Sequence, residues 1–335
     1  MSPPPVPAAE QAPLLDVRNL SVRLHTARGP AFAVRDLSFS LARGDTLGLV
    51  GESGCGKSMT ALALLGLTPE SAQIGGELYF QGRALLGLEE AELAALRGNR
   101  IAMIFQEPMT ALNPLHMVGH QIAEPLRMHK RFDATTARSR AISLLDRVGI
   151  ADARRRVDAY PHQLSGGQRQ RVTIAMALAC DPDLLIADEP TTALDVTVAR
   201  QILELIASLV QERGMGLLLI SHDLGVIAAN VNRVMVMYGG MMIEAGPSPQ
   251  VFRELRHPYS QGLYAARPRI GTPRIDGRRA RLATIAGSVP ELVDMPEGCA
   301  FANRCERVID ACRGAVPALQ AASPHHVVRC LRAME

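Results

Sequence analysis

The sequence has no long apolar run, which argues against a membrane-spanning helix. Its longest uncharged apolar stretch, VTIAMALAC from Val172 to Cys180, is about half of the roughly 20 residues that such a helix needs. The opening MSPPPVPAAEQAP has no charged start and no continuous apolar segment. We therefore expect residues 1–13 to be a disordered proline-rich leader rather than an export signal.

A large charge excess is also missing. The chain has 36 basic and 33 acidic residues and a formal net charge of +3, so bulk electrostatics give no reason to expect nucleic acid as a partner. Among the 36 basic residues, only Lys57 and Lys130 are lysine. A lysine kept against this bias indicates a site that needs a compact ammonium group.

Cysteine is scarce until the end of the chain, where four of the six cysteines lie. Because no export is expected, a metal site is favoured over a disulfide framework. The spacing C-x5-C-x6-C-x17-C lacks the paired C-x2-C of common zinc sites. The spacing therefore predicts four thiolates and leaves the metal open; they are Cys299, Cys305, Cys312 and Cys330.

A phosphate-binding loop is present in GESGCGKS, residues 51–58, between the β-favouring run TLGLV and a helix-favouring run. The glycines let successive N–H groups turn inward toward phosphate oxygens at a helix N-terminus. Lys57 is predicted to reach the β- and γ-phosphates, and Ser58 to bind Mg²⁺. A plain glycine-rich turn is the alternative. The predicted nucleotide contacts are Gly51, Ser53, Gly54, Cys55, Gly56, Lys57, Ser58 and Met59.

Two further apolar runs end in polar residues. LLIADEP would place Asp188 at the carboxyl end of a buried strand, suited to Mg²⁺, and Glu189 beside it, suited to activating water. The two carboxylates could instead cap the next helix. GLLLISHD would bring His222 to the same edge of the sheet. A strand-end histidine is usually an ordinary polar cap, but a third strand of the same kind favours a role at the site.

The segment LSGGQ, Leu164 to Gln168, precedes the helical stretch RQRVTIAMALA. Ser165 could be a simple N-cap, or the Ser-Gly-Gly opening could be an exposed anion site. One triphosphate does not easily need two such sites.

Over residues 14–265 these motifs resemble the ATP-binding-cassette (ABC) ATPases. GESGCGKS is similar to Walker A, LLIADE to Walker B, LSGGQ to the signature and TALD, Thr192 to Asp195, to the D-loop. Gln106 resembles the Q-loop glutamine, His222 the switch histidine and Phe32 the aromatic residue that stacks on adenine. The resemblance implies an α/β P-loop NTPase core with a RecA-like sheet and a helical subdomain at about residues 107–178.

The resemblance also implies head-to-tail dimers with a copy of the chain or a sister ATPase. The signature and D-loop of one chain would then serve the partner's ATP, through Ser165, Gly166, Gly167, Gln168 and Asp195. Each site would use Lys57, Gln106, Glu189 and His222 for catalysis. Its Mg²⁺ would be bound by Ser58, Gln106 and Asp188.

A narrower resemblance links FQEPMTALNP, YPHQLSGGQRQRV, RHPYSQGLY and GCAFANRC to the ATPases of bacterial dipeptide and oligopeptide importers, whose relatives import nickel. It implies ATP hydrolysis coupled to import, two membrane permease subunits, an extracytoplasmic binding protein and a position at the cytoplasmic face of the plasma membrane. Residues 266–335 would be the C-terminal extension of that group. Its cysteines would hold a 4Fe-4S cluster, with zinc or free thiols as alternatives.

Two rival functions come from other classes: a soluble ABC ATPase acting on DNA or ribosomes, and a metal-sensing regulator in which the tail is the active part. The chain has no long coiled coil, second cassette or basic arm to support the first. The arginine-rich stretch from Arg267 to Leu282 lacks interleaved aromatic residues, which favours a solvated linker.

Overall fold

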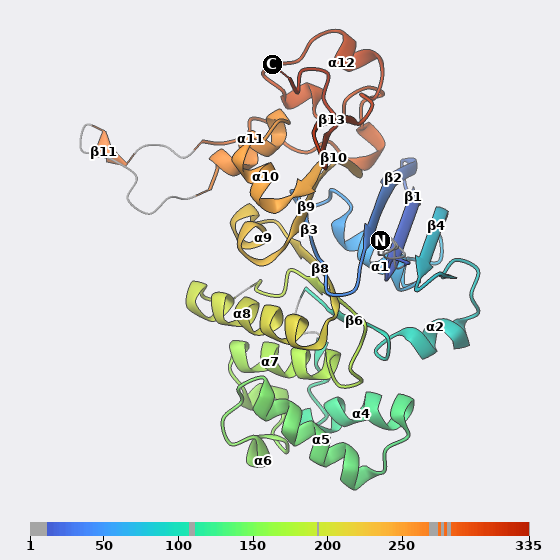
Figure 1. The fold of residues 1–335 in the computed structure, drawn as a ribbon, viewed down its shortest axis with the longest axis vertical. Coiled ribbons are helices and arrows are strands. Elements are labelled where there is room, and N and C mark those ends of the chain that lie inside the picture. The colour runs from blue at the N-terminus through green and yellow to red at the C-terminus, as the bar shows by residue number, and fades with distance from the viewer. Residues whose placement is uncertain are drawn as a thin grey trace, which may run out of the picture.

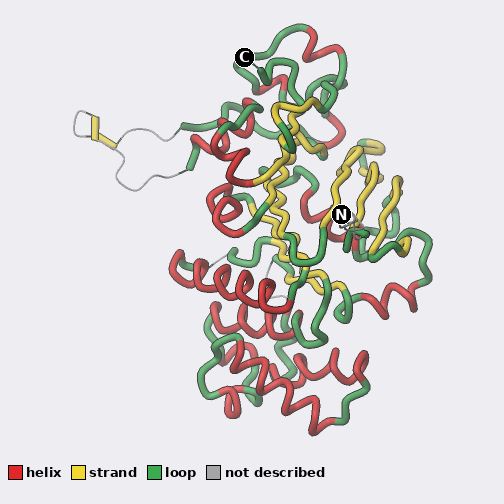
Figure 2. Tube along the Cα trace, viewed as in Figure 1, coloured by secondary structure: helices red, strands yellow, loops and turns green. Residues whose placement is uncertain are grey.

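The computed structural model describes residues 12–106, 111–192, 194–267 and 283–334, and the backbone at 274–275 and 278–279. Two sheets occupy the middle of the molecule, a group of helices forms one end, and the C-terminal segment forms the other (Figures 1 and 2). Most of the leader and of the arginine-rich stretch predicted as a linker lies outside the described residues.

The first sheet is antiparallel and built from the N-terminal part of the chain. Its strands follow the spatial order β2-β1-β4-β5. Their bounds are β1 Leu15–Thr26, β2 Gly29–Leu41, β4 Gln73–Phe80 and β5 Arg83–Ala84.

The second sheet has eight strands in the order β13-β14-β10-β9-β3-β8-β7-β6. Strands β9, β3, β8, β7 and β6 run parallel to one another, whereas β10 is antiparallel to β9 and to β14, and β14 to β13. The bounds are β3 Thr46–Val50, β6 Ile101–Ile104, β7 Leu184–Asp188, β8 Gly216–Ser221, β9 Arg233–Tyr238, β10 Met241–Pro247, β13 Gln320–Ser323 and β14 His326–Val328.

Burial on both faces explains why the central strands read as continuous apolar runs. Along β7, Leu184 and Ile186 belong to the core that the sheet shares with the antiparallel strands. Leu185 and Ala187, on the opposite face, belong to the core that it shares with the helices. The period of two along a strand therefore divides the interior into two cores.

The α-helices are α1 Lys57–Leu64, α2 Glu90–Leu96, α4 Val118–Lys130, α5 Ala134–Arg147, α6 Ala153–Arg156, α7 Gly166–Ala177, α8 Val196–Arg213, α9 Leu224–Asn230, α10 Ser248–Arg253, α11 Pro258–Ala265 and α12 Ala311–Gly314. Short 3₁₀ turns are η1 Pro161–Gln163, η2 Leu292–Asp294 and η3 Ala302–Arg304. The described part of the predicted helical subdomain, residues 111–178, contains α4 to α7 and no strand.

The C-terminal segment is joined to the main sheet. Strand β14 pairs with β10, with Val328 opposite Glu244, and Phe301 packs edge-on against Tyr238 and Tyr259. A tail too short and polar for a core of its own thus shares the core of the rest of the molecule through Ala300 and Phe301. Two short strands, β11 Arg274–Ile275 and β12 Arg278–Arg279, pair with each other.

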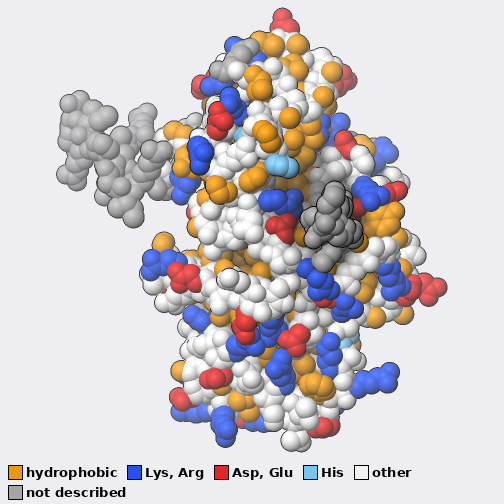
Figure 3. Space-filling view, in the orientation of Figure 1, with side chains coloured by type: hydrophobic (Ala, Val, Ile, Leu, Met, Phe, Trp, Pro, Cys, Tyr) orange, Lys and Arg blue, Asp and Glu red, His pale blue; other side chains and the backbone are white. Residues whose placement is uncertain are grey.

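Charged side chains of both signs are interspersed over the face shown in Figure 3, in keeping with the small net charge. None of the helices in the described ranges combines the length and the apolar composition that crossing a bilayer requires.

Candidate functional site

Three of the predicted site segments meet at one edge of the central sheet. Val50 at the end of β3 lies opposite Ser221 of β8, and Asp188 at the end of β7 lies opposite Ile220. The phosphate loop, the acidic pair and His222 follow these strand ends directly. This edge, at the carboxyl ends of parallel strands, is where open α/β sheets bind ligands.

The phosphate loop is shaped by its glycines. Gly54 and Gly56 have φ of 81° and 98°, in the left-handed region that favours glycine. A Cβ on Gly56 would also lie 2.3 Å from the carbonyl oxygen of Ala33. Cys55 is fully buried, so a contact from this residue to phosphate can come only from its backbone.

Lys57, at the first position of α1, is held beneath this loop. Its Nζ donates to the carbonyl oxygens of Gly51 and Glu52 at 2.8 and 3.0 Å, and the residue is 5% exposed. These contacts hold the ammonium group against backbone carbonyls of the loop.

Asp188 and Ser58 lie together and fit a Mg²⁺ site. Burial raises the pKa of Asp188, and a hydrogen bond from Ser58 opposes this rise. Asp188 is 3% exposed, and its Oδ1 has no hydrogen-bond partner among the described residues. An unpaired buried carboxylate oxygen beside a hydroxyl is the kind of oxygen ligand that Mg²⁺ prefers.

Three polar side chains lie within hydrogen-bonding distance of the Glu189 carboxylate. Its Oε2 lies 3.1 Å from Nδ1 of His222 and accepts hydrogen bonds from Nε2 of Gln106 at 3.3 Å and from the Thr192 hydroxyl at 3.0 Å. Glu189 adopts φ of 45°, an uncommon backbone conformation for a non-glycine residue. The sequence placed Thr192 only in the D-loop and gave no sign that it binds this carboxylate.

Phe32, predicted to stack on adenine, lies on β2 with 40% of its surface exposed. The guanidinium groups of Arg23 and Arg35 each lie 5.8 Å from the centre of its ring. The next residue, Ala33, contacts Gly56 of the phosphate loop. Phe32 therefore offers an exposed aromatic face close to that loop.

The signature segment lies on another element. Ser165 caps α7, accepting from the Gln168 N–H at 3.3 Å, while Gln168 Oε1 accepts from the Ser165 N–H at 3.0 Å. Helix α7 packs against α4, α5, α8 and β6, whereas α1 packs against β1, β2 and β7. Gly167 approaches Val198 of α8, whose N-cap is Asp195. The N-cap role considered for Ser165 is thus present. Within one chain, the signature and the phosphate loop pack on different elements.

The four C-terminal cysteines are free thiols that line one small cavity with His257 and Phe301. Burial, with a smaller effect of the other thiols, raises the pKa of Cys299 to about 11. The described residues contain no group of three or more His, Cys, Asp or Glu side chains arranged as a metal site. The cysteines share a cavity, and their thiol arrangement does not support iron or zinc.

Two long-range polar contacts were not foreseen from the sequence. Glu52 of the phosphate loop pairs with Arg304 at 2.6 Å. Glu244 of β10 and His326 of β14 form a pair at 2.9 Å in which neither side chain is exposed. The Glu244 carboxylate also accepts the backbone N–H groups of Arg256 and His257.

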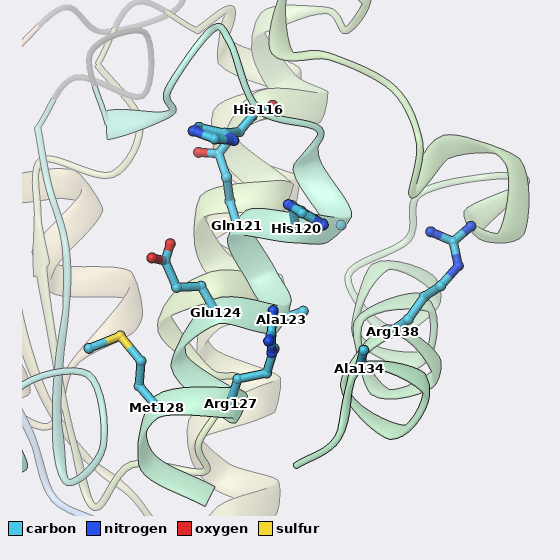
Figure 4. Close-up of a pocket in the computed structure, with 10 residues that line it drawn as sticks. His116, His120, Gln121, Ala123, Glu124, Arg127, Met128, Ala134 and Arg138 are labelled. Carbon is cyan, nitrogen blue, oxygen red and sulfur yellow. The ribbon is translucent and has the colours of Figure 1, made fainter. Parts of the chain in front are cut away.

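A separate cavity lies in the helical part of the molecule, between α4 and α5 (Figure 4). His120, Glu124 and Arg127 line it from α4, and Arg138 from α5. Arg138 is ion-paired with Asp158 at 2.7 Å. None of these residues belongs to the predicted nucleotide site.

Comparison with known families gives two matches on this chain. Residues 34–192 match the family described as ABC transporter. Residues 243–312 match the oligopeptide/dipeptide transporter C-terminal region. The second match includes Cys299, Cys305 and Cys312.

Curated relatives are similar over nearly the whole chain. A peptide import ATP-binding protein of Brucella melitensis is 48% identical over 331 residues, covering 96% of this chain and 98% of that protein. The oligopeptide transport ATP-binding protein OppD of Salmonella typhimurium is 47% identical over 332 residues, covering 98% and 97%.

Solved structures share the fold. A dimeric post-hydrolysis structure of the ATP-binding cassette MJ0796, bound to ADP and phosphate, is 27% identical with a TM-score of 0.63, covering 70% of this chain and 98% of that one. The cbiO1 protein of Clostridium perfringens, part of the transporter complex cbiONQ, is 26% identical with a TM-score of 0.61, covering 72% and 91%. The predicted family and the predicted P-loop ABC ATPase fold are confirmed. The chain belongs to the ATP-binding proteins of ABC transporters, within the oligopeptide and dipeptide transporter group.

Proposed function

We propose that this chain is one of two ATPase subunits that power a bacterial importer of dipeptides or oligopeptides from the cytoplasmic face of the plasma membrane. ATP hydrolysis coupled to transport is the activity of its family. The observation that carries the proposal is the meeting of the phosphate loop, Asp188 and Glu189 at one sheet edge. Relatives named for peptide import support the cargo.

The working unit in this proposal is a head-to-tail dimer. In one chain the phosphate loop and the signature lie on elements that pack in different places, so a second chain can bring its signature to the γ-phosphate. The solved relative MJ0796 is a dimer. Ser165, Gly166, Gly167, Gln168 and Asp195 would then act on the partner's nucleotide.

The chain's own residues would divide the work of hydrolysis. Lys57 would exchange its backbone carbonyl partners for the β- and γ-phosphates, and Phe32 would stack on the base. Glu189 would orient and deprotonate the attacking water, held by Gln106, His222 and Thr192. Ser58, Asp188 and Gln106 would hold Mg²⁺, which neutralises charge on the phosphates.

The permease would dock at an apolar groove of about 510 Å³ between the end of α1, β6, α4 and α7. Leu67 and Phe105 line it and are 41% and 45% exposed, and Met176 of α7 lines it from the other side. A short amphipathic helix of the permease fits such a groove through its apolar face. Gln106 follows Phe105 directly and would link this groove to Glu189.

For the four cysteines we keep the predicted 4Fe-4S cluster as a proposal, with zinc as the alternative. Its support is that the four free thiols line one cavity; they are not arranged there as a metal site, so a bound metal would have to draw them together. When bound, the metal would crosslink parts of the C-terminal segment that are already joined by backbone hydrogen bonds, such as the one from the Cys299 N–H to the Cys312 carbonyl at 2.7 Å.

Co-purification from membranes tests the transport role. A tagged chain expressed from its native locus should bring down two permease subunits and a second ATPase chain or copy in stoichiometric amounts, and added peptide with its binding protein should stimulate ATPase activity. A chain recovered with DNA or ribosomes, or without membrane subunits, would overturn the proposal.

A further inference from the structure

Arg304 joins the C-terminal segment to the phosphate loop. Its Nη1 and Nη2 donate to the two carboxylate oxygens of Glu52 at 2.6 and 3.1 Å. The side chain of Arg304 is 5% exposed and that of Glu52 is 29% exposed. A two-point guanidinium–carboxylate pair fixes orientation as well as distance.

The rest of the Arg304 side chain is held as firmly. Its Nε donates to the Ala286 carbonyl at 2.9 Å and its Nη1 also reaches the Tyr238 hydroxyl at 3.3 Å. The guanidinium lies 5.8 and 5.9 Å from the ring centres of Tyr238 and Phe301. These contacts hold the cation in one position, and among the described residues Glu52 is the carboxylate that pairs with it.

Glu52 is itself part of the nucleotide site through its backbone. Its N–H donates to the Tyr259 hydroxyl at 2.8 Å, and its carbonyl accepts from Lys57 Nζ at 3.0 Å. A displacement of Glu52 would move a carbonyl that holds the Lys57 ammonium group. The side chain and the N–H of this one residue are both bound by residues from the last third of the chain.

The position of Arg304 depends on the cysteine segment. Arg304 directly precedes Cys305 and ends the turn η3, whose first residue, Ala302, donates its N–H to the Cys299 carbonyl at 2.9 Å. Cys299 in turn donates to the Cys312 carbonyl. The backbone of Arg304 is thus held in place by hydrogen bonds that involve Cys299 and Cys312, two of the cysteines that line the small cavity.

We propose that Arg304 is a positioning residue of the nucleotide site: through Glu52 it holds the phosphate loop in its binding conformation, so that affinity for MgATP depends on the folded state of the cysteine segment. The proposal rests on the proposed ATPase function. It gives the C-terminal segment a role in nucleotide binding that is exerted through Glu52.

The test compares the full-length wild-type chain with three single variants. Arg304→Met keeps an unbranched apolar side chain, and Glu52→Gln keeps the shape of the carboxylate without its charge. Arg304→Lys keeps the positive charge but cannot make the two-point contact to Glu52. Equilibrium binding of a fluorescent ATP analogue with Mg²⁺ should weaken about 5- to 30-fold in the first two, and less in Arg304→Lys. In the assembled transporter, KM for ATP should rise while kcat stays near wild type.

The double variant Arg304→Met/Glu52→Gln should bind no more weakly than the worse single variant, because both act through one pair. Arg28→Met is the matched control. Arg28 pairs with Asp294 at 2.7 and 2.8 Å and so also joins the core to the C-terminal segment, without touching the phosphate loop. Its nucleotide affinity should equal that of wild type.

Folded Arg304→Met and Glu52→Gln proteins that bind MgATP as wild type does would overturn the inference, as would additive losses in the double variant. A kcat loss at unchanged KM would overturn it too. A wild-type chain that binds no ATP would instead refute the ATPase function itself, so the two failures are distinguishable.

Discussion

The Nδ1 atom of His222 lies 3.1 Å from Oε2 of Glu189, and the same oxygen accepts hydrogen bonds from Gln106 and Thr192. One carboxylate oxygen thus ties together segments that follow β6, β7 and β8. Gln106 follows β6 beside the apolar groove and donates to Glu189, so a movement of this segment would change the contacts of the Glu189 carboxylate. This geometry supplies a physical route by which docking of a permease could influence hydrolysis.

Replacing Glu189 by glutamine should stop turnover without preventing nucleotide binding. The amide keeps the size of the side chain but cannot take a proton from water, so ATP hydrolysis by the assembled complex should fall by about 10²- to 10⁴-fold. Glu212→Gln, an exposed change near the far end of α8, is the control and should leave hydrolysis unchanged. Substantial residual ATPase activity in Glu189→Gln would contradict the assigned role.

Replacing Asp188 by asparagine should remove the response to Mg²⁺. The buried carboxylate has an unpaired Oδ1, and losing its charge should weaken Mg²⁺ binding at least about tenfold. Titrating Mg²⁺ into the ATP-bound chain and following its melting temperature measures this. Wild type should be stabilised and Asp188→Asn should not. Equal stabilisation of both proteins would show that the metal binds elsewhere.

Metal analysis tests the cysteine site. Anaerobically purified wild-type chain should be brown and contain iron and acid-labile sulfide, and Cys312→Ser should lose both. Cys180→Ala is the matched control, since Cys180 is also a buried free thiol but lies in the main core. A colourless chain that contains one zinc ion would favour zinc over the iron–sulfur cluster. A chain without metal would refute the site.

A charge placed in the apolar groove should disconnect the ATPase from its permease. Leu67→Glu introduces a carboxylate into a wall of the groove, where burial by a docked helix would be unfavourable. Membrane recovery should drop at least about tenfold while ATP binding by the isolated chain is retained. Leu331→Glu, with similar exposure of 45% in the C-terminal segment, should remain membrane-associated. Equal recovery of both variants would exclude the groove as the docking site.

The buried pair between Glu244 and His326 should be a large contributor to stability. His326→Ala removes the imidazole that is hydrogen-bonded to the buried Glu244 side chain, and an unsatisfied buried polar group costs about 1–3 kcal/mol in unfolding free energy. Urea unfolding measures this. His25→Ala, at an exposed position of β1, should change the free energy of unfolding by less than about 0.5 kcal/mol. Comparable effects of the two changes would argue against a stabilising pair.

Local sequence patterns were enough to predict which residues lie together at the ends of the parallel strands. Lys57, Asp188 and His222 each follow a buried apolar run, and parallel pairing brings such ends together whatever the intervening residues are. Arg304 and Glu52 are 252 residues apart, and nothing in either neighbourhood specifies the other. Their pairing arises from tertiary packing around Tyr238 and Phe301.

The same reasoning explains the strands that the sequence did not reveal. QAAS and HVV, which form β13 and β14, are too short to show a clear period of two. Segment 326–328 becomes a strand because β10 offers it an edge, and β13 pairs in turn with β14. The resemblance to the family predicted a C-terminal extension. Its attachment to the central sheet through β14 could be seen only in the structure.

During synthesis, strand β10 is complete well before β14, the second strand that pairs with it. Glu244 and His326 are 82 residues apart, and at roughly 5–20 residues per second a ribosome needs about 4–16 s to cover that distance. Over this interval the outer edge of β10 and a carboxylate destined for burial stay open to solvent. Maturation of this ATPase therefore ends at its C-terminal segment, and a nascent chain stalled before residue 326 would carry an open sheet edge able to pair with other chains.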